Sequence, residues 1–172
     1  MDSNEKQLLR RQLSAARPHS SAGLTEQLVA VVAQHGAKTV ASYWPLSSEP
    51  DVSEFNIWAA GRLNLLLPRV SGHELEFAAG ELGEGAFGIA EPKGTGVPIA
   101  EIDLMIVPAL AADMAGNRLG KGKGFYDRVL SHYSGKRIAV IFDSELIENV
   151  PSEPHDQRVQ MIVTPLRTIL VG

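Results

Sequence analysis

The sequence predicts an α/β protein in which helices and a mostly parallel β-sheet form three layers, α/β/α. Strand-like apolar runs alternate along the chain with segments whose apolar residues recur at helical spacing. Two of the strand-like segments, 102–107 and 137–142, are apolar almost throughout, which is typical of parallel strands covered on both faces. The length of 172 residues suits one core, so we expect a single domain over residues 1–172.

Four helices are expected, at residues 4–17, 24–35, 51–61 and 124–132. The first has an apolar stripe made of Leu8, Leu9, Leu13 and Ala16. Pro18 stops this helix, because the residue before a proline avoids helical backbone angles. Gly36 is well placed to end the second helix, and residues 51–54 resemble a capping box that opens the third.

Strands are expected at residues 39–43, 63–67, 73–77, 102–107, 137–142, 160–164 and 168–171. Pro68 is expected to close the second strand, the last strand is placed at an edge, and residues 80–98 are interpreted as loops. Ligands of such sheets bind beyond the carboxyl ends of the strands. The loops that follow strands, 43–50, 108–123 and 142–157, are therefore expected to surround a site.

The composition narrows the classes of function. Cysteine is absent, which excludes disulfides, thiolate metal sites and a thiol nucleophile. No apolar run approaches the roughly 20 residues of a membrane-spanning helix, so we expect a cytoplasmic protein without a membrane partner. The net charge of −4 argues against general nucleic-acid binding and still allows one local anion site.

The most informative segment is a glycine-rich basic loop before the fourth expected helix. Gly120, Gly122 and Gly124 alternate with Lys121 and Lys123, and glycine lets backbone N–H groups approach a ligand closely. Segment 113–128 holds four cations and two anions, so it is basic within an acidic chain. The pattern favours an oligophosphate site over the alternative, a flexible surface turn with solvated lysines. It lacks the Gly-Lys-Ser/Thr ending of a Walker A loop.

A second glycine-spaced run, residues 83–88, matches the dinucleotide-binding pattern only superficially. That pattern requires a helix to start at the glycines, so that its N-terminus faces a pyrophosphate. Pro92, Gly94, Gly96 and Pro98 follow this run and exclude such a helix. We interpret residues 83–88 as an ordinary loop.

Three further groups of side chains have a functional and a structural interpretation. Lys6 and Arg10 share one helix face and could reach one phosphate group, or could simply be solvated. Asp127 could bind Mg²⁺ beside the glycine-rich loop, with Asp156 as a partner from another loop, or could stabilise a helix N-terminus.

Trp44 and Glu49 form the third group, close together in the loop after the first strand. They could bind a flat heteroaromatic ligand, or could be a core tryptophan and a solvated carboxylate. Among the five histidines only His155 lies near this chemistry, and no catalytic triad or metal-spaced histidine pair can be identified.

Residues 103–128 resemble the signature of the 5-formyltetrahydrofolate cyclo-ligase (methenyltetrahydrofolate synthetase) family. The signature is a strand ending in Val-Pro, then Gly-x-Arg-Leu-Gly-x-Gly-x-Gly-Tyr/Phe-Tyr-Asp-Arg, and residues 116–128 fit it without a gap. Further matching elements occur at residues 6–10, 43–51, 67–70, 88–92 and 153–156. Three positions depart from the family pattern: Ala112 replaces an aromatic residue, and Gln160 and Pro165 each replace an acid.

The resemblance implies a fold of the type shared with ribose-phosphate isomerases and CoA transferases. It also implies an enzyme that uses ATP and Mg²⁺ to convert 5-formyltetrahydrofolate to 5,10-methenyltetrahydrofolate, a reaction of one-carbon metabolism with ADP and phosphate as products. We expect a monomer rather than an obligate oligomer. A non-catalytic folate- or nucleotide-binding regulator, or an ATP-independent isomerase or transferase of similar fold, is the alternative.

The resemblance also implies roles for individual residues. ATP would be bound by Lys6, Arg10, Arg118, Leu119, Gly120, Lys121, Gly122, Lys123, Gly124, Phe125 and Tyr126. The folate would be bound by Trp44, Glu49, Lys121, Gly122, Lys123, Gly124 and Phe125. Catalysis is assigned to Arg118, Lys121 and Lys123, and Mg²⁺ binding to Asp127 and Asp156.

Overall fold

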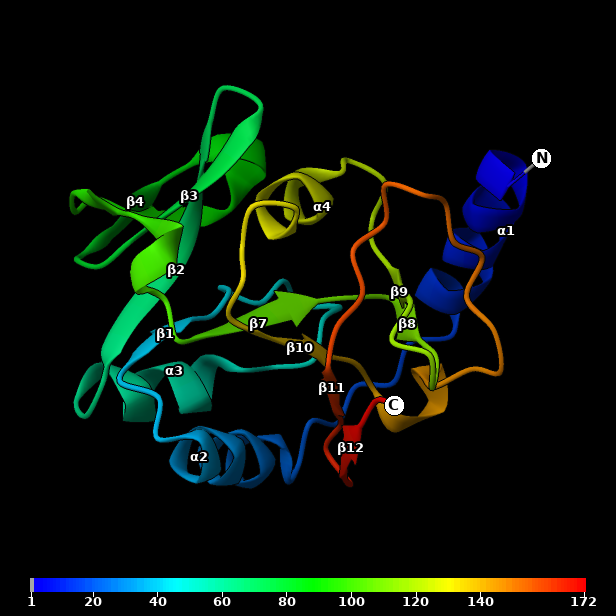
Figure 1. Ribbon diagram of the computed structural model, residues 1–172, viewed down its shortest axis with the longest axis horizontal. Helices are drawn as coiled ribbons and strands as arrows, with labels where there is room; N and C mark the ends of the chain where they lie inside the picture. Colours follow the sequence, from blue (N-terminus) through cyan, green and yellow to red (C-terminus); the bar gives the residue numbers. More distant parts are fainter. Residues whose placement is uncertain (1) are drawn as a thin grey trace.

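The structure, a computed structural model that describes residues 2–172, is built around an eight-stranded sheet (Figure 1). Its strands are β1 (Thr39–Ala41), β2 (Asn64–Ser71), β3 (Glu74–Ala78), β6 (Gly96–Val97), β7 (Leu104–Pro108), β10 (Lys136–Val140), β11 (Met161–Val163) and β12 (Thr168–Leu170). The spatial order is β12-β11-β10-β7-β1-β2-β3-β6. The five strands from β11 to β2 run parallel, and antiparallel strands flank them on both sides. The predicted, mostly parallel sheet is confirmed.

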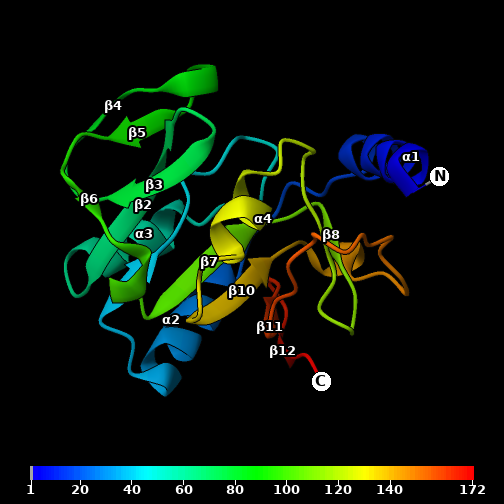
Figure 2. The same ribbon diagram turned by 45° about the horizontal axis from the view of Figure 1, so that its top comes forward.

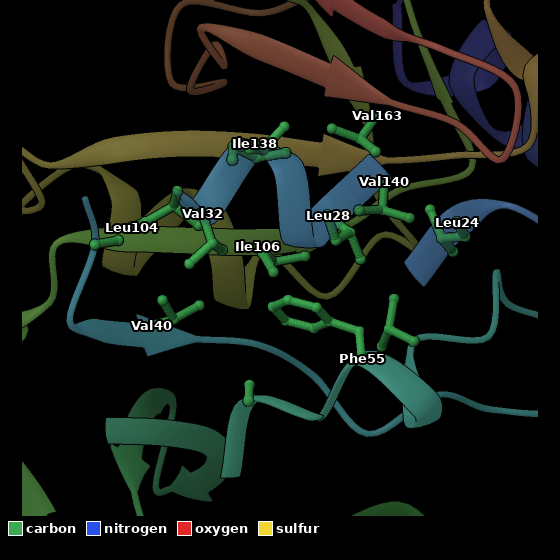
Figure 3. Packing of buried hydrophobic residues seen from close by; sticks show 14 of the residues in the cluster. Leu24, Leu28, Val32, Val40, Phe55, Leu104, Ile106, Ile138, Val140 and Val163 are labelled. Carbon is green, nitrogen blue, oxygen red and sulfur yellow. The ribbon is translucent and has the colours of Figure 1, made fainter. Parts of the chain in front are cut away.

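Helices lie on both faces of the sheet, as predicted. They are α1 (Asp2–Ala15), α2 (Leu24–His35), α3 (Ser53–Ala60) and α4 (Phe125–Leu130). Figure 1 shows α2 and α3 on one face and α4 on the other. On the first face, Leu28 of α2 and Phe55 of α3 pack against fully buried side chains of the parallel strands, among them Val40, Ile106 and Ile138 (Figure 3). This packing removes the apolar face of each helix from water, which is the main favourable contribution to folding.

Strand β2 continues through Pro68, so the prediction that this residue closes the strand was wrong. Its parallel partner β1 pairs with β2 only as far as Leu66. Beyond that point β2 is hydrogen-bonded on one side, to β3, and the register places Pro68 opposite Phe77. The missing N–H of proline therefore removes no bond to β1, and the residue is tolerated as on an edge strand.

Residues 80–98 are more ordered than predicted. They contain β4 (Leu82–Glu84) and β5 (Ala90–Pro92), which pair in a separate two-stranded sheet, and two 3₁₀ turns, Ala86–Gly88 and Ile99–Glu101 just beyond. Figure 2 shows β4 and β5 beyond β2 and β3, on the side of the molecule away from the C-terminus. Arg69 of β2 fastens this unit by donating a hydrogen bond to the carbonyl oxygen of Pro92 (3.1 Å). Such long-range contacts leave no local pattern in the sequence.

Two helix predictions need smaller corrections. Helix α3 begins after Val52 without a side-chain cap, because the Asp51 carboxylate bonds to the backbone N–H of Ser53 in a local turn instead of capping the helix. In α1 the predicted apolar stripe is only half used. Leu9 and Leu13 pack against buried residues after β7, whereas Leu8 is 56% exposed. Ala16 is exposed beyond the helix.

The segment after β7 forms a hairpin that the sequence analysis treated as loop. Its strands are β8 (Ala111–Ala112) and β9 (Arg118–Leu119). The buried Asp113 carboxylate closes the turn by accepting bonds from the backbone N–H groups of Ala115 and Asn117, both at 3.0 Å. The hairpin returns the chain toward the end of β7, which delivers the glycine-rich loop to the carboxyl edge of the sheet.

A buried ion pair ties the chain between α1 and α2 to the same edge. Arg17 lies 2.7 Å from Glu145, and both side chains are almost fully buried. Arg17 also donates to the carbonyl oxygen of Ala109, directly after β7 (3.0 Å). Burial raises the pKa of the Glu145 carboxyl, and the bond from Arg17 opposes this effect.

Across the described residues, none of the helices combines the length and apolar character needed to cross a membrane.

We predict that Arg17→Met lowers the free energy of unfolding at pH 7 by about 3–5 kcal/mol, because it leaves a buried carboxylate unpaired. A carboxyl whose folded-state pKa is raised contributes stability below its unfolded-state pKa and loses it as pH rises. The penalty is therefore larger at pH 7 than at pH 5. Urea unfolding at both pH values measures it, with the exposed Arg11→Met as control. Equal penalties at the two pH values would contradict this explanation.

Candidate active site

A pocket of about 570 Å³ lies where the strand ends, α1 and the β4–β5 unit meet. Figures 1 and 2 show the segment between β9 and α4 lying between α1 and the β4–β5 unit. The pocket is lined by all the residues predicted for the site: Lys6, Arg10, Trp44, Glu49, Arg118, Leu119, Gly120, Lys121, Gly122, Lys123, Gly124, Phe125, Tyr126, Asp127 and Asp156. The structure thus brings together side chains that are up to 150 positions apart in the sequence.

The glycine-rich loop needs glycine for its backbone conformation. Gly122 and Gly124 have φ values of 102° and 72°, in the left-handed region that side chains with a Cβ atom disfavour. Gly124 is also the N-cap residue of α4. Arg10 of α1 closes on this loop and donates from Nε to the carbonyl oxygen of Gly120 (2.8 Å). A Cβ atom on Gly122 would lie 3.4 Å from the Arg10 guanidinium carbon, so helix and loop are in close contact.

Three cations of the pocket are each paired with a carboxylate of the pocket. The Lys6 ammonium lies 2.5 Å from Asp156, the Arg118 guanidinium lies 2.7 Å from Asp127, and the Lys121 ammonium lies 2.6 Å from Glu49. Each pair joins a predicted phosphate-binding cation to a predicted metal- or folate-binding acid. The pocket therefore holds concentrated charge of both signs. Oligophosphate, metal or polar ligand groups could replace the present ion-pair partners.

Arg118 is the most buried of these cations, with a side chain only 3% exposed. Burial lowers the pKa of its guanidinium, and the charge of Asp127 acts in the opposite direction. Its Nε atom is buried without a hydrogen-bond partner among the described residues. One hydrogen-bond donor of this buried cation is thus unused. An unpaired buried donor costs free energy, so it calls for an explanation such as a role in function.

The acids expected to bind a metal ion do not form one cluster. Asp156 groups with Glu153 and His155, whose ligand atoms lie within 4.8 Å of one another. Asp127 is outside this group and accepts bonds at Oδ1 from Arg118 (2.7 Å) and from the backbone N–H of Gln157 (3.0 Å). Gln157 directly follows Asp156, so both acids face one pocket from neighbouring positions. One or two carboxylates together with phosphate oxygens suit Mg²⁺, so the residues present fit the predicted ion.

Aromatic side chains and one buried carboxylate line another part of the pocket. Trp44 is half-buried and faces the pocket, so it is not a residue of the main core. The Glu49 carboxylate is buried, and its second oxygen accepts a bond from the backbone N–H of Leu46 (2.8 Å). Burial raises the pKa of the Tyr126 hydroxyl, and the negative charge of Glu49 raises it further. Tyr126 is therefore a neutral hydrogen-bonding group at physiological pH.

Several lining residues were absent from the predicted site, notably Arg69, Phe87, Glu91 and Glu153. Phe87 lies in the glycine-spaced run interpreted as an ordinary loop; no α-helix starts there, but its turn lines the pocket. Arg69, Glu91 and Glu153 belong to segments that match the family pattern. Their segments were therefore visible in the sequence, but their proximity to the glycine-rich loop was not.

The departures from the family pattern lie outside the pocket lining. Ala112 is fully buried in the β8–β9 hairpin. The side-chain oxygen of Gln160 accepts a bond from the backbone N–H of Arg137 (2.7 Å), at the start of two neighbouring strands. Pro165 stands close to α2, since a Cβ atom on Gly23 would lie 2.4 Å from its carbonyl oxygen. None of the three contributes to the lining of the pocket.

Lys6 forms ion pairs with Glu153 and Asp156, and the effect of these pairs on the pKa values can be tested. Burial acts to raise the pKa of the Asp156 carboxyl, but bonds from Lys6 and from the backbone N–H of Glu153 hold it below its usual value. Burial similarly acts to lower the pKa of the Lys6 ammonium, and its bonds to the two acids raise it overall. A carboxyl with a lowered folded-state pKa contributes stability that is lost as pH falls.

We predict that Lys6→Met moves the pKa of Asp156 from below to above its usual value, because burial then acts with less opposition. Carboxyl ¹³C NMR titration measures this, with Lys136→Met at an exposed position as control. The difference in unfolding free energy between wild type and Lys6→Met should narrow as the pH falls below about 4, near the usual pKa of Asp. An unchanged Asp156 pKa in the variant would show that the ion pair does not form in solution.

Comparison with known proteins agrees with the fold and with the family resemblance of the sequence. The sequence model of the 5-formyltetrahydrofolate cyclo-ligase family matches residues 2–165. The 5-formyltetrahydrofolate cyclo-ligase of Mycolicibacterium smegmatis is 37% identical over 148 residues, which cover 77% of this chain and 76% of that protein. The Haemophilus influenzae 5-formyltetrahydrofolate cyclo-ligase is 30% identical over 180 residues, covering 95% of this chain and 92% of the relative.

A solved structure gives the same result. The NMR structure of Aquifex aeolicus 5,10-methenyltetrahydrofolate synthetase superimposes with a TM-score of 0.84 and 30% sequence identity. The match covers 96% of this chain and 92% of that one. With the family match over almost the whole length and the predicted signature residues gathered in one pocket, the chain belongs to the 5-formyltetrahydrofolate cyclo-ligase family.

Proposed function

We propose that the protein converts 5-formyltetrahydrofolate to 5,10-methenyltetrahydrofolate, with ATP and Mg²⁺ as cosubstrate and cofactor and with ADP and phosphate as products. The observation that carries this proposal is the single pocket lined both by the glycine-rich basic loop and by Trp44 and Glu49. One part of the pocket suits an oligophosphate and the other suits a flat heteroaromatic ring. Family membership supports the same reaction.

The chemistry requires activation of a poor leaving group. The γ-phosphoryl group of ATP is transferred to the formyl oxygen, which breaks its bond to the β-phosphate oxygen and releases ADP. The second folate nitrogen then attacks the activated formyl carbon and loses its proton. The carbon–oxygen bond breaks, phosphate leaves with the formyl oxygen, and the five-membered ring is closed. The tasks of the protein are to position both substrates and to stabilise transferring charge.

We assign the phosphates of ATP to the cations on either side of the loop. Lys6 and Arg10 would hold them from α1, and residues 118–126 would contact them with backbone N–H groups and with Arg118, Lys121 and Lys123. Asp127 and Asp156 would hold Mg²⁺, which would supply positive charge to the phosphates. Lys123 is exposed and, unlike Lys6, Arg118 and Lys121, has no ion pair among the described residues, which leaves its ammonium available to the phosphoryl group.

We assign the folate to the aromatic part of the pocket. The Trp44 ring would stack on the pterin or on its linker, and the buried Glu49 carboxylate would accept hydrogen bonds from the pterin edge. Phe125 and the exposed ring of Phe87 would complete the wall beside the reacting formyl group. Aromatic side chains supply large contact areas with little loss of conformational entropy.

An activity assay tests the proposal. The protein is mixed with 5-formyltetrahydrofolate, ATP and Mg²⁺, and formation of 5,10-methenyltetrahydrofolate is followed by the absorbance of this product. We expect ADP to appear in equal amount. Turnover without ADP release would favour an ATP-independent isomerase or transferase. Binding of both ligands without turnover would favour a non-catalytic regulator.

We predict that Lys123→Ala lowers kcat/KM about 100-fold, or about 3 kcal/mol, the loss expected when a preorganised electrostatic group is removed. The matched control is Lys136→Ala, which removes an exposed lysine outside the pocket and should leave kcat/KM unchanged. Steady-state kinetics with both substrates measures the change. If Lys123→Ala changes ligand affinity but not turnover, Lys123 has no role in the chemical step.

We predict that Glu49→Gln binds ADP more tightly than wild type, by up to about fivefold, because it releases Lys121 from its ion pair. The same variant should bind 5-formyltetrahydrofolate less tightly, since a carboxylate accepts charge-assisted hydrogen bonds that an amide cannot. Isothermal titration calorimetry measures both affinities, and Lys121→Gln is the control that should weaken ADP binding. Weaker ADP binding to Glu49→Gln would mean that the ion pair does not compete with nucleotide.

A further inference from the structure

Phe87 has a backbone conformation that bulky residues rarely adopt. Its φ value is 57°, and it is the only non-glycine residue with positive φ among residues 2–172. The residue forms the centre of the turn Ala86–Gly88 between β4 and β5, and its ring is 61% exposed. Such strain persists only where surrounding contacts impose it, and it is concentrated at functional sites.

The Phe87 ring faces the glycine-rich loop. The Lys123 ammonium lies 3.2 Å from the centroid of the ring, which is cation–π contact distance. The ring of Phe125, the first residue of α4, lies 6.3 Å from the Phe87 ring, centroid to centroid, and is tilted from it by 59°. The strained residue therefore contacts the loop lysine that has no carboxylate partner among the described residues, whereas Lys121 is paired with Glu49.

The side chain of Glu91 on β5 bonds to the backbone directly before Phe87. One carboxylate oxygen of Glu91, Oε1, accepts bonds from the backbone N–H of Ala86, next to Phe87, and from that of Val70 in β2, both at 3.1 Å. The same side chain packs against Gly85, where a Cβ atom would lie 2.2 Å from its Cγ atom. Glu91 thus joins the start of the turn to a strand of the main sheet.

We propose that Glu91 is a positioning residue for the reaction: through Ala86 and Val70 it holds Phe87 in its strained conformation, and Phe87 in turn positions the Lys123 ammonium. This inference rests on the proposed function, because it gives Lys123 a role in phosphoryl transfer. Glu91 itself lines the pocket, so its chemistry must distinguish this role from a substrate contact. The oxygen that bonds to both N–H groups is an acceptor that glutamine can reproduce, so the proposed role needs the oxygen and not the charge.

NMR tests the structural part without depending on activity. An aromatic ring in contact with an ammonium shifts the adjacent methylene protons upfield. We expect upfield-shifted Lys123 methylene resonances in wild type and in Glu91→Gln, and ordinary positions in Glu91→Ala and Phe87→Ala. Upfield-shifted resonances that persist in Glu91→Ala would overturn the proposal. Thermal unfolding of each variant confirms that the comparison is made between folded proteins.

Kinetics tests the functional part. We expect Glu91→Ala to lower kcat about tenfold with little change in either KM, the pattern for loss of positioning in the transition state. Glu91→Gln should retain at least half of the wild-type kcat. In a Phe87→Ala background, Glu91→Ala should have no further effect, because the pathway through Phe87 is already broken.

Two kinetic outcomes would overturn the proposal. Equal losses in Glu91→Gln and Glu91→Ala would mean that the charge of Glu91 acts directly on a substrate. Losses that multiply in the double variant would mean that Glu91 does not act through Phe87. Absence of turnover in wild type would refute the proposed function instead, and the NMR comparison would still decide whether Glu91 holds Phe87 against Lys123.

Discussion

Several cations lie together at the carboxyl edge of the parallel sheet, in a chain that is acidic overall. The structure depends on balancing their charge. Lys6, Arg118 and Lys121 lie around one pocket, and like charges in proximity are unfavourable unless they are balanced. The balance comes from Asp156, Asp127 and Glu49, each within ion-pair distance of one cation. The same acids suit the metal ion and the folate. The pocket therefore has these cations and acids neutralised in pairs.

The fold serves this arrangement by bringing distant segments to one place. The β8–β9 hairpin returns the chain so that Arg118 and the glycine-rich loop follow the end of β7. Arg17, paired with Glu145 and bonded to Ala109, fixes the chain after α1 near the same strand end. Helix α1 is thereby held beside the loop, where Arg10 and Lys6 can act. The β4–β5 unit closes the remaining side and carries Phe87.

Much of the fold was predictable because it rests on local periodicity. Helix α2 and its end at Gly36, strand β3 and the edge strand β12 all follow from spacing and from turn residues. The path of β2 through Pro68 was not predictable, because it depends on where the pairing of β2 with β1 ends. That pairing ends at Leu66, before Pro68. The β4–β5 unit was also missed, since side chains of β2 and β5 hold it and its strands are short and separated by glycines.

The site was predictable for a different reason. The glycine-rich loop is a local pattern with a physical meaning, and the family resemblance favoured the functional interpretation of Lys6, Trp44 and Asp156. Pairing of Lys121 with Glu49, and of Phe87 with Lys123, could not be inferred, because these contacts join segments that are related only in space. Sequence patterns thus predicted residues that line one pocket, whereas the structure shows which side chains contact one another there.

The central claim is that the glycine-rich loop and α1 together hold the phosphates of a nucleotide. A crystal structure of the protein with ADP and Mg²⁺ tests it most directly. We predict phosphate oxygens within hydrogen-bond distance of backbone N–H groups in residues 118–126, with Lys6 turned from Asp156 toward the phosphates. Nucleotide bound elsewhere on the molecule, with the Lys6 and Arg118 ion pairs intact, would contradict the claim.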